Sequence, residues 1–253
     1  MRKEKVNVNM ADFPSRLHWL FENAGVYDSS SHSGATVLYL DTGYYLKTDE
    51  KGKLAGEAAR AEFFHSLGLG VEVIEYLSAD RDWLVTRSAE GEDLTHYFNE
   101  PARLCREYAK ALRRLHSCPV EGCGISPALQ RYMELIPSGE GSEWARISWF
   151  PFASREEAWA VIEKNREKLK ADTLIHGDAC LPNVLLKDWS FSAFIDFGQA
   201  GAGDRHIDLF WALWSLEYNL KTDAWTDYFL DCYGRENFDM EILRVAAAFE
   251  YLG

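Results

Sequence analysis

The sequence predicts an α+β protein with a small β-rich lobe over residues 1–88 and a larger, mainly helical lobe over residues 89–253. Short runs of β-branched and aromatic residues, separated by turns of small polar residues, are concentrated in the first part. Apolar residues at helical spacing dominate the second part. The segment Arg87–Gly91 interrupts both patterns, and we expect it to connect the two lobes.

The overall composition is that of a soluble protein large enough to bury a full core. Its 253 residues are 47% hydrophobic and 26% charged, and the formal net charge is −13. This acidity argues against nucleic acid as a partner, because phosphate groups must be neutralised by lysine and arginine. It permits attraction of a cationic substrate, although acidity also serves solubility alone.

The sequence shows no sign of export or of membrane insertion. Residues 1–10 contain no apolar core of a signal peptide, and no apolar run is long enough to cross a bilayer. The five cysteines include no Cys-x-x-Cys pair, which favours reduced thiols over a disulfide framework or a zinc site. We therefore expect a cytoplasmic protein that does not bind membranes.

The first lobe is expected to begin with a short amphipathic helix over Phe13–Asn23, followed by strands over Thr36–Leu40 and Tyr44–Lys47. The loop before these strands, around Ser33, is rich in small polar residues. Such a loop can bring backbone N–H groups close to phosphate oxygens, but a plain surface turn has the same composition. Both interpretations stay open for this loop.

A lysine at the end of an aromatic-rich strand is the next unusual feature. Lys47 follows two tyrosines and a leucine, and a helix is predicted over Leu54–Leu67. Kinases use a strand lysine, paired with a glutamate of the following helix, to hold the α- and β-phosphates of a nucleotide. Glu57 is the preferred partner because it lies early in the helix, and Glu62 is the alternative. Either acid could also be a solvated helix residue.

Two further strands, over Val71–Tyr76 and Asp82–Thr86, are expected to complete the first lobe. In the second lobe the helical pattern recurs several times. We expect helices over Pro101–His116, Glu156–Lys170, Thr226–Tyr233 and Met240–Leu252, and in the Trp-rich segment that follows Gly201–Asp204.

The segment 176–198 carries the strongest chemical signal in the chain. It reads His-Gly-Asp-Ala-Cys-Leu-Pro-Asn over residues 176–183 and, after an apolar run, Ile-Asp-Phe-Gly over residues 195–198. In phosphoryl transfer one carboxylate orients and deprotonates a hydroxyl, while an amide and a second carboxylate hold magnesium against nucleotide phosphates. Asp178, Asn183 and Asp196 have the types and the order that this chemistry requires, so the sequence predicts a phosphoryl-transfer enzyme.

Three other polar residues of the second lobe have more than one explanation. His116 ends a predicted helix and has no metal-ligating residue nearby, so we expect a packed histidine rather than a ligand. Asp204 can cap the Trp-rich helix, and Asp208 points from its first turns toward the core. Either aspartate could also support the catalytic loop by accepting its hydrogen bonds.

With these residues in place, the chain resembles the aminoglycoside phosphotransferases, especially their 3′ group, whose fold is that of protein kinases. The resemblance covers nearly the whole chain and is most specific at His176–Asn183, Ile195–Gly198 and Gly201–Leu209. It implies a bilobal protein-kinase-like fold. It also implies that the γ-phosphate of ATP or GTP is transferred, with Mg²⁺, to the 3′ hydroxyl of an aminoglycoside such as kanamycin or neomycin. Because the product binds ribosomal RNA poorly, the implied role is antibiotic resistance.

The resemblance also implies roles for individual residues of this sequence. Asp178 is implied as the catalytic base, and Asn183 and Asp196 as the magnesium ligands. The implied nucleotide-binding residues are a loop residue, the lysine–glutamate pair and two residues of the lobe connection, namely Ser33, Lys47, Glu57, Arg87 and Ala89. The implied antibiotic-binding residues are the catalytic base and three residues of the last helices, namely Asp178, Glu217, Asn219 and Glu250.

The sequence departs from the family pattern mainly where the antibiotic would bind. Gln199 stands where relatives usually carry arginine, and Asn219 where an acid is frequent. Acids expected near Ile147 are missing, although Glu140 or Glu143 could replace them. Two alternatives therefore stay open: a kinase for another small hydroxyl compound, such as an amino alcohol, a sugar amine or a macrolide, and a nucleotide-binding module without catalysis.

Overall fold

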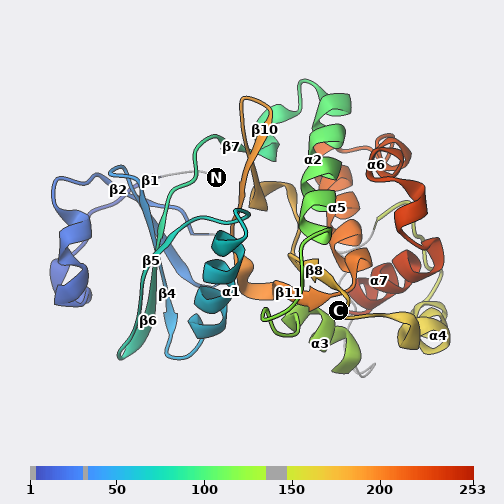
Figure 1. The fold of residues 1–253 in the computed structure, drawn as a ribbon, viewed down its shortest axis with the longest axis horizontal. Coiled ribbons are helices and arrows are strands. Elements are labelled where there is room, and N and C mark those ends of the chain that lie inside the picture. Colours follow the sequence, from blue (N-terminus) through green and yellow to red (C-terminus); the bar gives the residue numbers. More distant parts are fainter. Residues whose placement is uncertain (1–3, 31–33, 135–146) are drawn as a thin grey trace. The chain divides into compact units, whose positions relative to one another are not determined.

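The computed structural model describes residues 4–30, 34–134 and 147–253. Residue contacts divide the chain into two compact units, Met1–Glu90 and Gly91–Gly253. The first unit is rich in strands and the second is mainly helical, as expected for the predicted α+β class (Figure 1). Within the described ranges, no helix combines the length and the apolar character needed to span a bilayer.

The first unit is built on an antiparallel six-stranded sheet with the strand order β1-β2-β3-β4-β6-β5. Its strands are β1 (Glu4–Lys5), β2 (Val26–Asp28), β3 (Thr36–Leu40), β4 (Tyr44–Glu50), β5 (Val73–Ser78) and β6 (Arg81–Arg87), and helix α1 (Ala55–Ser66) follows β4 in the chain. Residues two apart on a strand share one face of the sheet. Leu38 and Leu40 on β3 are both buried in this way.

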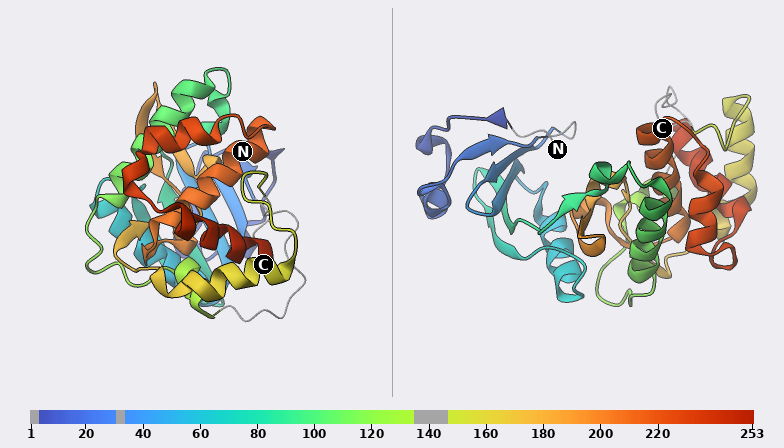
Figure 2. Two further views of the ribbon diagram at one scale, coloured as in Figure 1. Left: turned by 90° about the vertical axis from the view of Figure 1, so that its right-hand side faces the viewer. Right: turned by 90° about the horizontal axis from the view of Figure 1, so that it is seen from above.

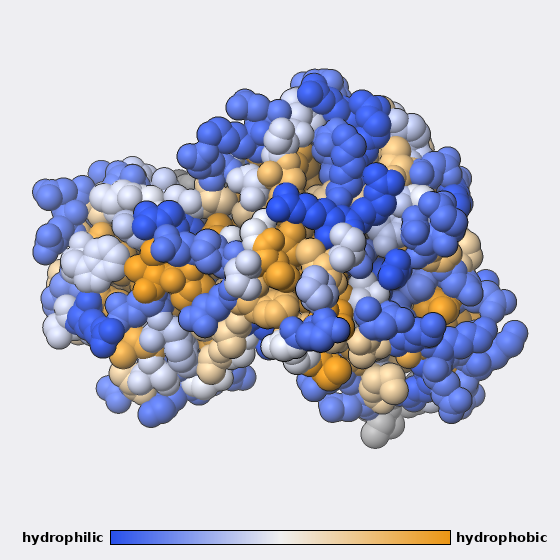
Figure 3. All heavy atoms as spheres, viewed as in Figure 1, coloured by the Kyte–Doolittle hydropathy of each residue, from blue (hydrophilic) through white to orange (hydrophobic). Residues whose placement is uncertain are grey.

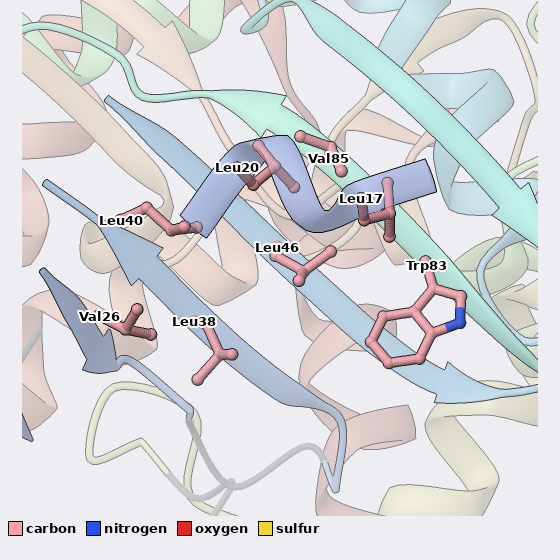
Figure 4. Packing of buried hydrophobic residues seen from close by; sticks show 8 residues of the cluster. All are labelled: Leu17, Leu20, Val26, Leu38, Leu40, Leu46, Trp83 and Val85. Carbon is pink, nitrogen blue, oxygen red and sulfur yellow. The ribbon is translucent and has the colours of Figure 1, made fainter. Parts of the chain in front are cut away.

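One face of this sheet packs against a short helical segment, η2 (Ser15–Phe21). Leu17 and Leu20 of η2 are buried against the sheet residues Val26, Leu38, Leu40, Leu46, Trp83 and Val85 (Figure 4). The segment is a 3₁₀ helix, preceded by a second one, η1 (Met10–Asp12), and not the longer helix that we expected over Phe13–Asn23. The two buried leucines are three residues apart, which places them on one side of a helix with three residues per turn.

A buried carboxylate joins β6 to the start of α1. Asp82 is 0% exposed and accepts hydrogen bonds from the Leu54 backbone N–H, at 2.9 Å, and from the Ser78 hydroxyl, at 2.7 Å. Burial alone would raise the pKa of Asp82, but hydrogen bonds from Ser78, from Tyr76 and from the backbone of residues 52 and 54 lower it to about 2. The ionised form of this residue therefore stabilises the first unit.

We expect Asp82→Asn to destabilise the protein by about 1–3 kcal/mol at neutral pH, because the amide cannot accept all of these hydrogen bonds. The folded-state pKa lies below the ordinary value of 3.8, so the carboxylate contributes stability above about pH 4 and loses it as the pH falls toward 2. Urea unfolding of both proteins should therefore show a stability difference that shrinks with acid. A difference independent of pH would contradict this assignment.

The second unit consists mainly of the helices α2 (Pro101–His116), α3 (Pro127–Glu134), α4 (Arg155–Asn165), α5 (Arg205–Leu220), α6 (Thr226–Tyr233) and α7 (Met240–Leu252). Helix α4 lies alongside α7 (Figure 2). The predicted bounds of α2, α6 and α7 are confirmed. The helix expected over Glu156–Lys170 instead begins at Arg155, after the N-cap Ser154, and ends at Asn165.

Short strands and 3₁₀ segments connect these helices. Strands β7 (Glu92–Asp93), β9 (Val184–Lys187) and β10 (Ser190–Phe194) form one antiparallel sheet, and β8 (Thr173–Ile175) pairs with β11 (Gly201–Gly203). The 3₁₀ segments are η3 (Leu94–Tyr97), η5 (Arg166–Lys168), η6 (Leu181–Asn183), η7 (Phe197–Gln199) and η8 (Arg235–Asn237). Strands β9 and β10 form a hairpin within the apolar run that separates residues 176–183 from residues 195–198.

Polar side chains cover most of the face of the molecule in view in Figure 3, with small hydrophobic areas between them. The large hydrophobic residues that are exposed in the described ranges are Trp19, Ile125, Met133, Tyr218 and Met240. Of these, Tyr218 lines a groove of the second unit.

Candidate active site

The loop that follows β8 is held by a buried aspartate of α5. Asp208 is 0% exposed, and its carboxylate accepts hydrogen bonds from the backbone N–H groups of His176, at 2.8 Å, and Gly177, at 2.7 Å. The same carboxylate lies 3.1 Å from Nε2 of His116, whose Nδ1 lies 2.8 Å from the Tyr233 hydroxyl. Asp208 is thus a support of the loop, and His116 is the packed histidine that the sequence predicts.

The second aspartate of this segment has a different function. Asp204 caps α5 by accepting a hydrogen bond from the His206 backbone N–H at 3.0 Å. It also accepts a bond of 2.9 Å from the Lys170 backbone N–H. Of the two explanations left open for Asp204, capping is the one that these contacts favour.

Two further side chains fix the loop beyond Gly177. The Tyr108 hydroxyl of α2 donates to the Ala179 carbonyl, and the Leu181 N–H donates to Oγ of Ser215, at 2.9 Å. Burial raises the pKa of Tyr108 well above its usual range, so the hydroxyl stays protonated as a donor. Burial, reinforced by the charge of Asp178, likewise raises the pKa of the Cys180 thiol, which keeps this cysteine protonated.

His176 connects the loop to the strand that leads to Asp196. Its Nδ1 lies 3.3 Å from the Asp178 backbone N–H, and its Nε2 lies 2.8 Å from the Ile195 carbonyl. Because an N–H can only donate and a carbonyl can only accept, these partners require a neutral imidazole with its proton on Nε2. The Ile195 N–H also donates to the Asn183 carbonyl, at 3.1 Å. The backbone just before Asp196 is therefore tied directly to the loop.

Asp178 and Asn183 lie in contact within this loop. The Asn183 amide Nδ2 donates to the Asp178 carbonyl, at 2.9 Å, and to its carboxylate Oδ2, at 3.1 Å. Both donated bonds fix the amide plane, so the amide oxygen points away from Asp178. The Asp178 carboxylate and the Asn183 amide group are therefore neighbours in one loop.

The backbone at two positions of the motif is left-handed. Gly177 has φ +78°, and a Cβ there would lie 2.2 Å from the Gln199 carbonyl oxygen, which only glycine avoids. Asp196 has φ 65° and ψ 70°, an uncommon conformation for a residue with a side chain. Such strained residues are concentrated at functional sites, where the surrounding structure holds them in place.

In the first unit, Lys47 and Glu57 form an ion pair. Lys47 Nζ lies 2.9 Å from both Glu57 carboxylate oxygens, and Glu57 is only 8% exposed. Glu62, the alternative partner, is exposed on α1. The predicted pairing of a strand lysine with an early helix glutamate is thus present, and its contact with a nucleotide stays a prediction.

The other predicted nucleotide-binding residues are Ser33, Arg87 and Ala89. Ser33 lies outside the described residues. The same is true of Glu140 and Glu143, which could replace the acids missing from the antibiotic site. Arg87 ends β6 and pairs with Glu72 at 2.8 Å. Ala89 is partly buried in the segment that follows.

A groove of about 560 Å³ lies at the C-terminal end of α5, lined by Ser148, Trp214, Glu217, Tyr218, Lys221, Thr222 and Asp223. The Glu217 carboxylate accepts hydrogen bonds from the Ser148 N–H at 2.9 and 3.0 Å. The Ser148 hydroxyl donates to Oδ2 of Asp223, also at 2.9 Å. Two acidic groups and an aromatic surface therefore meet in one groove.

The other two predicted antibiotic-binding residues have intramolecular partners. The Asn219 amide donates to the Ser215 carbonyl, at 2.8 Å, one turn earlier on α5. Glu250 of α7 is 2% exposed, pairs with Arg131 at 2.5 Å and accepts a 2.6 Å bond from the Tyr132 hydroxyl. Burial raises the pKa of Glu250, and the Arg131 charge opposes this shift.

Several residues that shape the site were not predicted from the sequence. Asp223, Trp214 and Tyr218 line the groove beside Glu217, and Tyr108 and Ser215 hold the loop. The spacing of the two aromatic residues, four positions apart on one helix, was a signal that could have pointed to the groove. Tyr108 is distant from the loop in sequence, and no local pattern indicates its contact.

The donor atoms of the motif suit a magnesium ion. Asn183 and Asp196 offer an amide and a carboxylate oxygen, which are hard ligands of the kind that Mg²⁺ prefers. Within the described ranges no group of at least three His, Cys, Asp or Glu residues could hold a metal. In nucleotide sites Mg²⁺ generally uses one or two protein ligands together with phosphate oxygens and water.

Comparison with known proteins places the chain in a family. The model of the phosphotransferase enzyme family matches residues 28–245. A probable aminoglycoside 3′-phosphotransferase of Lactococcus lactis is 38% identical, over 99% of this chain and 98% of its own length. A streptomycin 3″-kinase of Streptomyces griseus is 30% identical, over 76% of this chain and 75% of its own.

Solved structures show the same fold. An aminoglycoside phosphotransferase of Streptomyces rimosus aligns with a TM-score of 0.74 at 21% identity, covering 97% of this chain and 99% of that one. This match confirms the predicted protein-kinase-like fold. Together with the family match, the full-length relative shows that the chain belongs to the aminoglycoside phosphotransferase family of kinases.

Proposed function

We propose that this protein transfers the γ-phosphate of ATP or GTP to a hydroxyl of an aminoglycoside such as kanamycin or neomycin, with the 3′ hydroxyl as the expected acceptor. The observation that carries the proposal is the junction of Asp178, Asn183 and the backbone before Asp196. Two relatives named for modifying aminoglycoside hydroxyls support the substrate class.

Asp178 is proposed as the catalytic base. Its carboxylate would orient the acceptor hydroxyl and take up its proton late, because the transition state of phosphoryl transfer is loose and needs little base strength. The Asn183 bond to Oδ2, at 3.1 Å, would fix the direction in which the carboxylate faces the acceptor. Positioning of the two reactants then supplies much of the rate.

Asn183 and Asp196 are proposed to hold Mg²⁺, through the amide oxygen and the carboxylate. When bound, the metal would offset the negative charge of the triphosphate. Asn183 is held by its amide bonds to Asp178, and Asp196 by the anchored backbone of Ile195, so both ligands would be positioned before the nucleotide binds.

The first unit is proposed as the nucleotide-binding lobe, with the functional division between residues 88 and 89. Lys47, oriented by Glu57, would contact the α- and β-phosphates. The loop at Ser33 would position the phosphates, and the backbone at Arg87 and Ala89 would meet the base. Solved family members contain ADP with streptomycin and GDP with kanamycin, which is why both donors are proposed.

The antibiotic is proposed to bind in the groove of the second unit. Glu217 and Asp223 supply negative charge there, and each carboxylate oxygen can accept more than one hydrogen bond. Asn219 lies on the same turns of α5, and Glu250 of α7 is the remaining proposed contact. An ammonium-rich substrate fits these groups, and nucleic acid does not.

The five free thiols further suggest a cytoplasmic location.

A transfer assay over a panel of acceptors tests this function. The panel should contain kanamycin, neomycin, streptomycin, choline, a sugar amine and a macrolide, each with ATP and with GTP. We expect phosphorylation of at least one aminoglycoside, and mass and NMR analysis of the product would identify the hydroxyl. Turnover confined to a non-aminoglycoside acceptor, or nucleotide binding without any turnover, would overturn the proposal.

The acidic groove predicts a salt-dependent KM for kanamycin. Added salt screens exposed charges over about 10 Å at 0.1 M, so KM should rise with ionic strength. Glu217→Gln should raise KM at low salt by about tenfold and flatten this dependence, because one carboxylate is removed. Glu163→Gln, an exposed substitution on α4 with the same change in net charge, is the matched control. Equal KM changes in the two variants would exclude a local role for Glu217.

A further inference from the structure

The last turns of α5 present a stacked pair of aromatic rings to the groove. Trp214 and Tyr218 lie one helical turn apart, with ring centroids 4.9 Å apart and an interplanar angle of 11°. Tyr218 is 57% exposed although it is one of the largest side chains of the groove. An exposed tyrosine ring beside carboxylates is a favourable place for an ammonium group, because its face carries negative potential.

The protein itself places a cation at this position. Lys221 Nζ lies 4.1 Å from the centroid of the Tyr218 ring. Because Trp214 covers one face of that ring, the ammonium group lies over the other. Lys221 is the C-cap residue that follows Leu220 at the end of α5, with φ 58° and ψ 30°. Glycine or asparagine adopts this left-handed conformation at lower cost, so the backbone gives no reason for a lysine here.

The groove therefore contains an internal competitor for cationic ligands. Its lining includes two acids, Glu217 and Asp223, and one base, Lys221. A substrate amine that approaches the Tyr218 ring must displace the Lys221 ammonium group. The loss of the Lys221–Tyr218 contact offsets part of the binding free energy that the substrate amine gains at the ring.

We propose that Lys221 is a specificity-determining residue, which occupies the Tyr218 ring and lowers the affinity of the groove for amine-rich aminoglycosides. The inference rests on the proposed function, because it takes the groove as the antibiotic site. A purely structural alternative exists, in which the lysine stabilises the negative end of the α5 dipole. Loss of the Lys221 charge should lower KM if the lysine competes for the ring, and should leave KM unchanged if the lysine acts only on the helix dipole.

The test is Lys221→Gln, assayed with neomycin and kanamycin. Removal of the competitor should lower KM by about two- to fivefold with little change in kcat, since a cation–π contact at an exposed site is worth that factor. Calorimetric titration of neomycin should show the same change in Kd. Lys221→Arg keeps the charge and should retain wild-type KM. In the Lys221→Gln background, Tyr218→Leu should abolish the gain, because the ring is the shared site.

A matched control excludes a general charge effect. Lys164→Gln changes the net charge equally at an exposed position of α4 and should leave KM unchanged. An unchanged or raised KM in Lys221→Gln, or an equal fall in Lys164→Gln, would overturn the inference while wild-type turnover upheld the proposed function. If the wild type turned over no aminoglycoside, the proposed function would fail, and an unchanged neomycin Kd would then overturn the inference as well.

Discussion

Asp178→Asn is expected to lower kcat for aminoglycoside phosphorylation by about 10²- to 10⁴-fold, the range that a general base contributes. The amide has the same shape as the carboxylate and can still accept the Asn183 hydrogen bond, but it cannot take up the acceptor proton. The KM for ATP and the unfolding midpoint should stay close to wild type. Steady-state kinetics and a calorimetric titration with ATP measure these quantities.

A matched control for this variant lies in the turn of the β9–β10 hairpin. Asp188 is exposed and left-handed, with φ 50°, a conformation that asparagine tolerates well. Asp188→Asn should therefore keep full activity. If Asp178→Asn phosphorylated kanamycin at a rate comparable to the wild type, the role assigned to this carboxylate would be wrong.

The second large effect is expected for Asp208→Ala, which should destabilise the protein by about 3–5 kcal/mol and remove most of its activity. The substitution leaves the N–H groups of His176 and Gly177 and the His116 ring without their buried acceptor. The loop that presents Asp178 would lose its main support. Urea unfolding followed by fluorescence gives the loss of stability, and kcat at a temperature where the variant is folded gives the loss of positioning.

A surface ion pair serves as the comparison for Asp208→Ala. Asp231 pairs with Arg235 at 2.7 Å, with its side chain 63% exposed. Asp231→Ala should cost no more than about 1 kcal/mol, because exposed ion pairs are screened by solvent. Similar losses of stability in the two variants would show that the Asp208 network does not hold the loop in the way described.

Local sequence patterns predicted those parts of the fold that depend on neighbouring residues. Helix α2 was predicted with its observed bounds because its apolar positions repeat at helical spacing over four turns. The pairing of Lys47 with Glu57 was predictable because a strand and the helix after it bring the two together. The motif at 176–198 identified the loop because its residue types and order carry chemical meaning.

Other features could not be predicted because they depend on distant contacts or on unusual turns. The β9–β10 hairpin turns at Asp188 and Trp189, both left-handed, and neither is the glycine that normally indicates such a turn. Glu250 is buried against Arg131, which lies 119 residues earlier in the chain. The sequence around Glu250 therefore gives no indication that Arg131 is its partner. The groove at α5 likewise joins Ser148 to residues more than 60 positions away.

The proposed mechanism requires that Asp178, Asn183 and Asp196 bring a magnesium-bound triphosphate and an antibiotic hydroxyl together. A crystal structure with Mg²⁺, a non-hydrolysable ATP analogue and kanamycin tests it most directly. We expect Mg²⁺ at about 2.0–2.1 Å from the Asn183 amide oxygen and the Asp196 carboxylate. We also expect a kanamycin hydroxyl at about 2.6–3.2 Å from Asp178. Metal bound to other residues, or kanamycin bound without a hydroxyl near Asp178, would contradict the account.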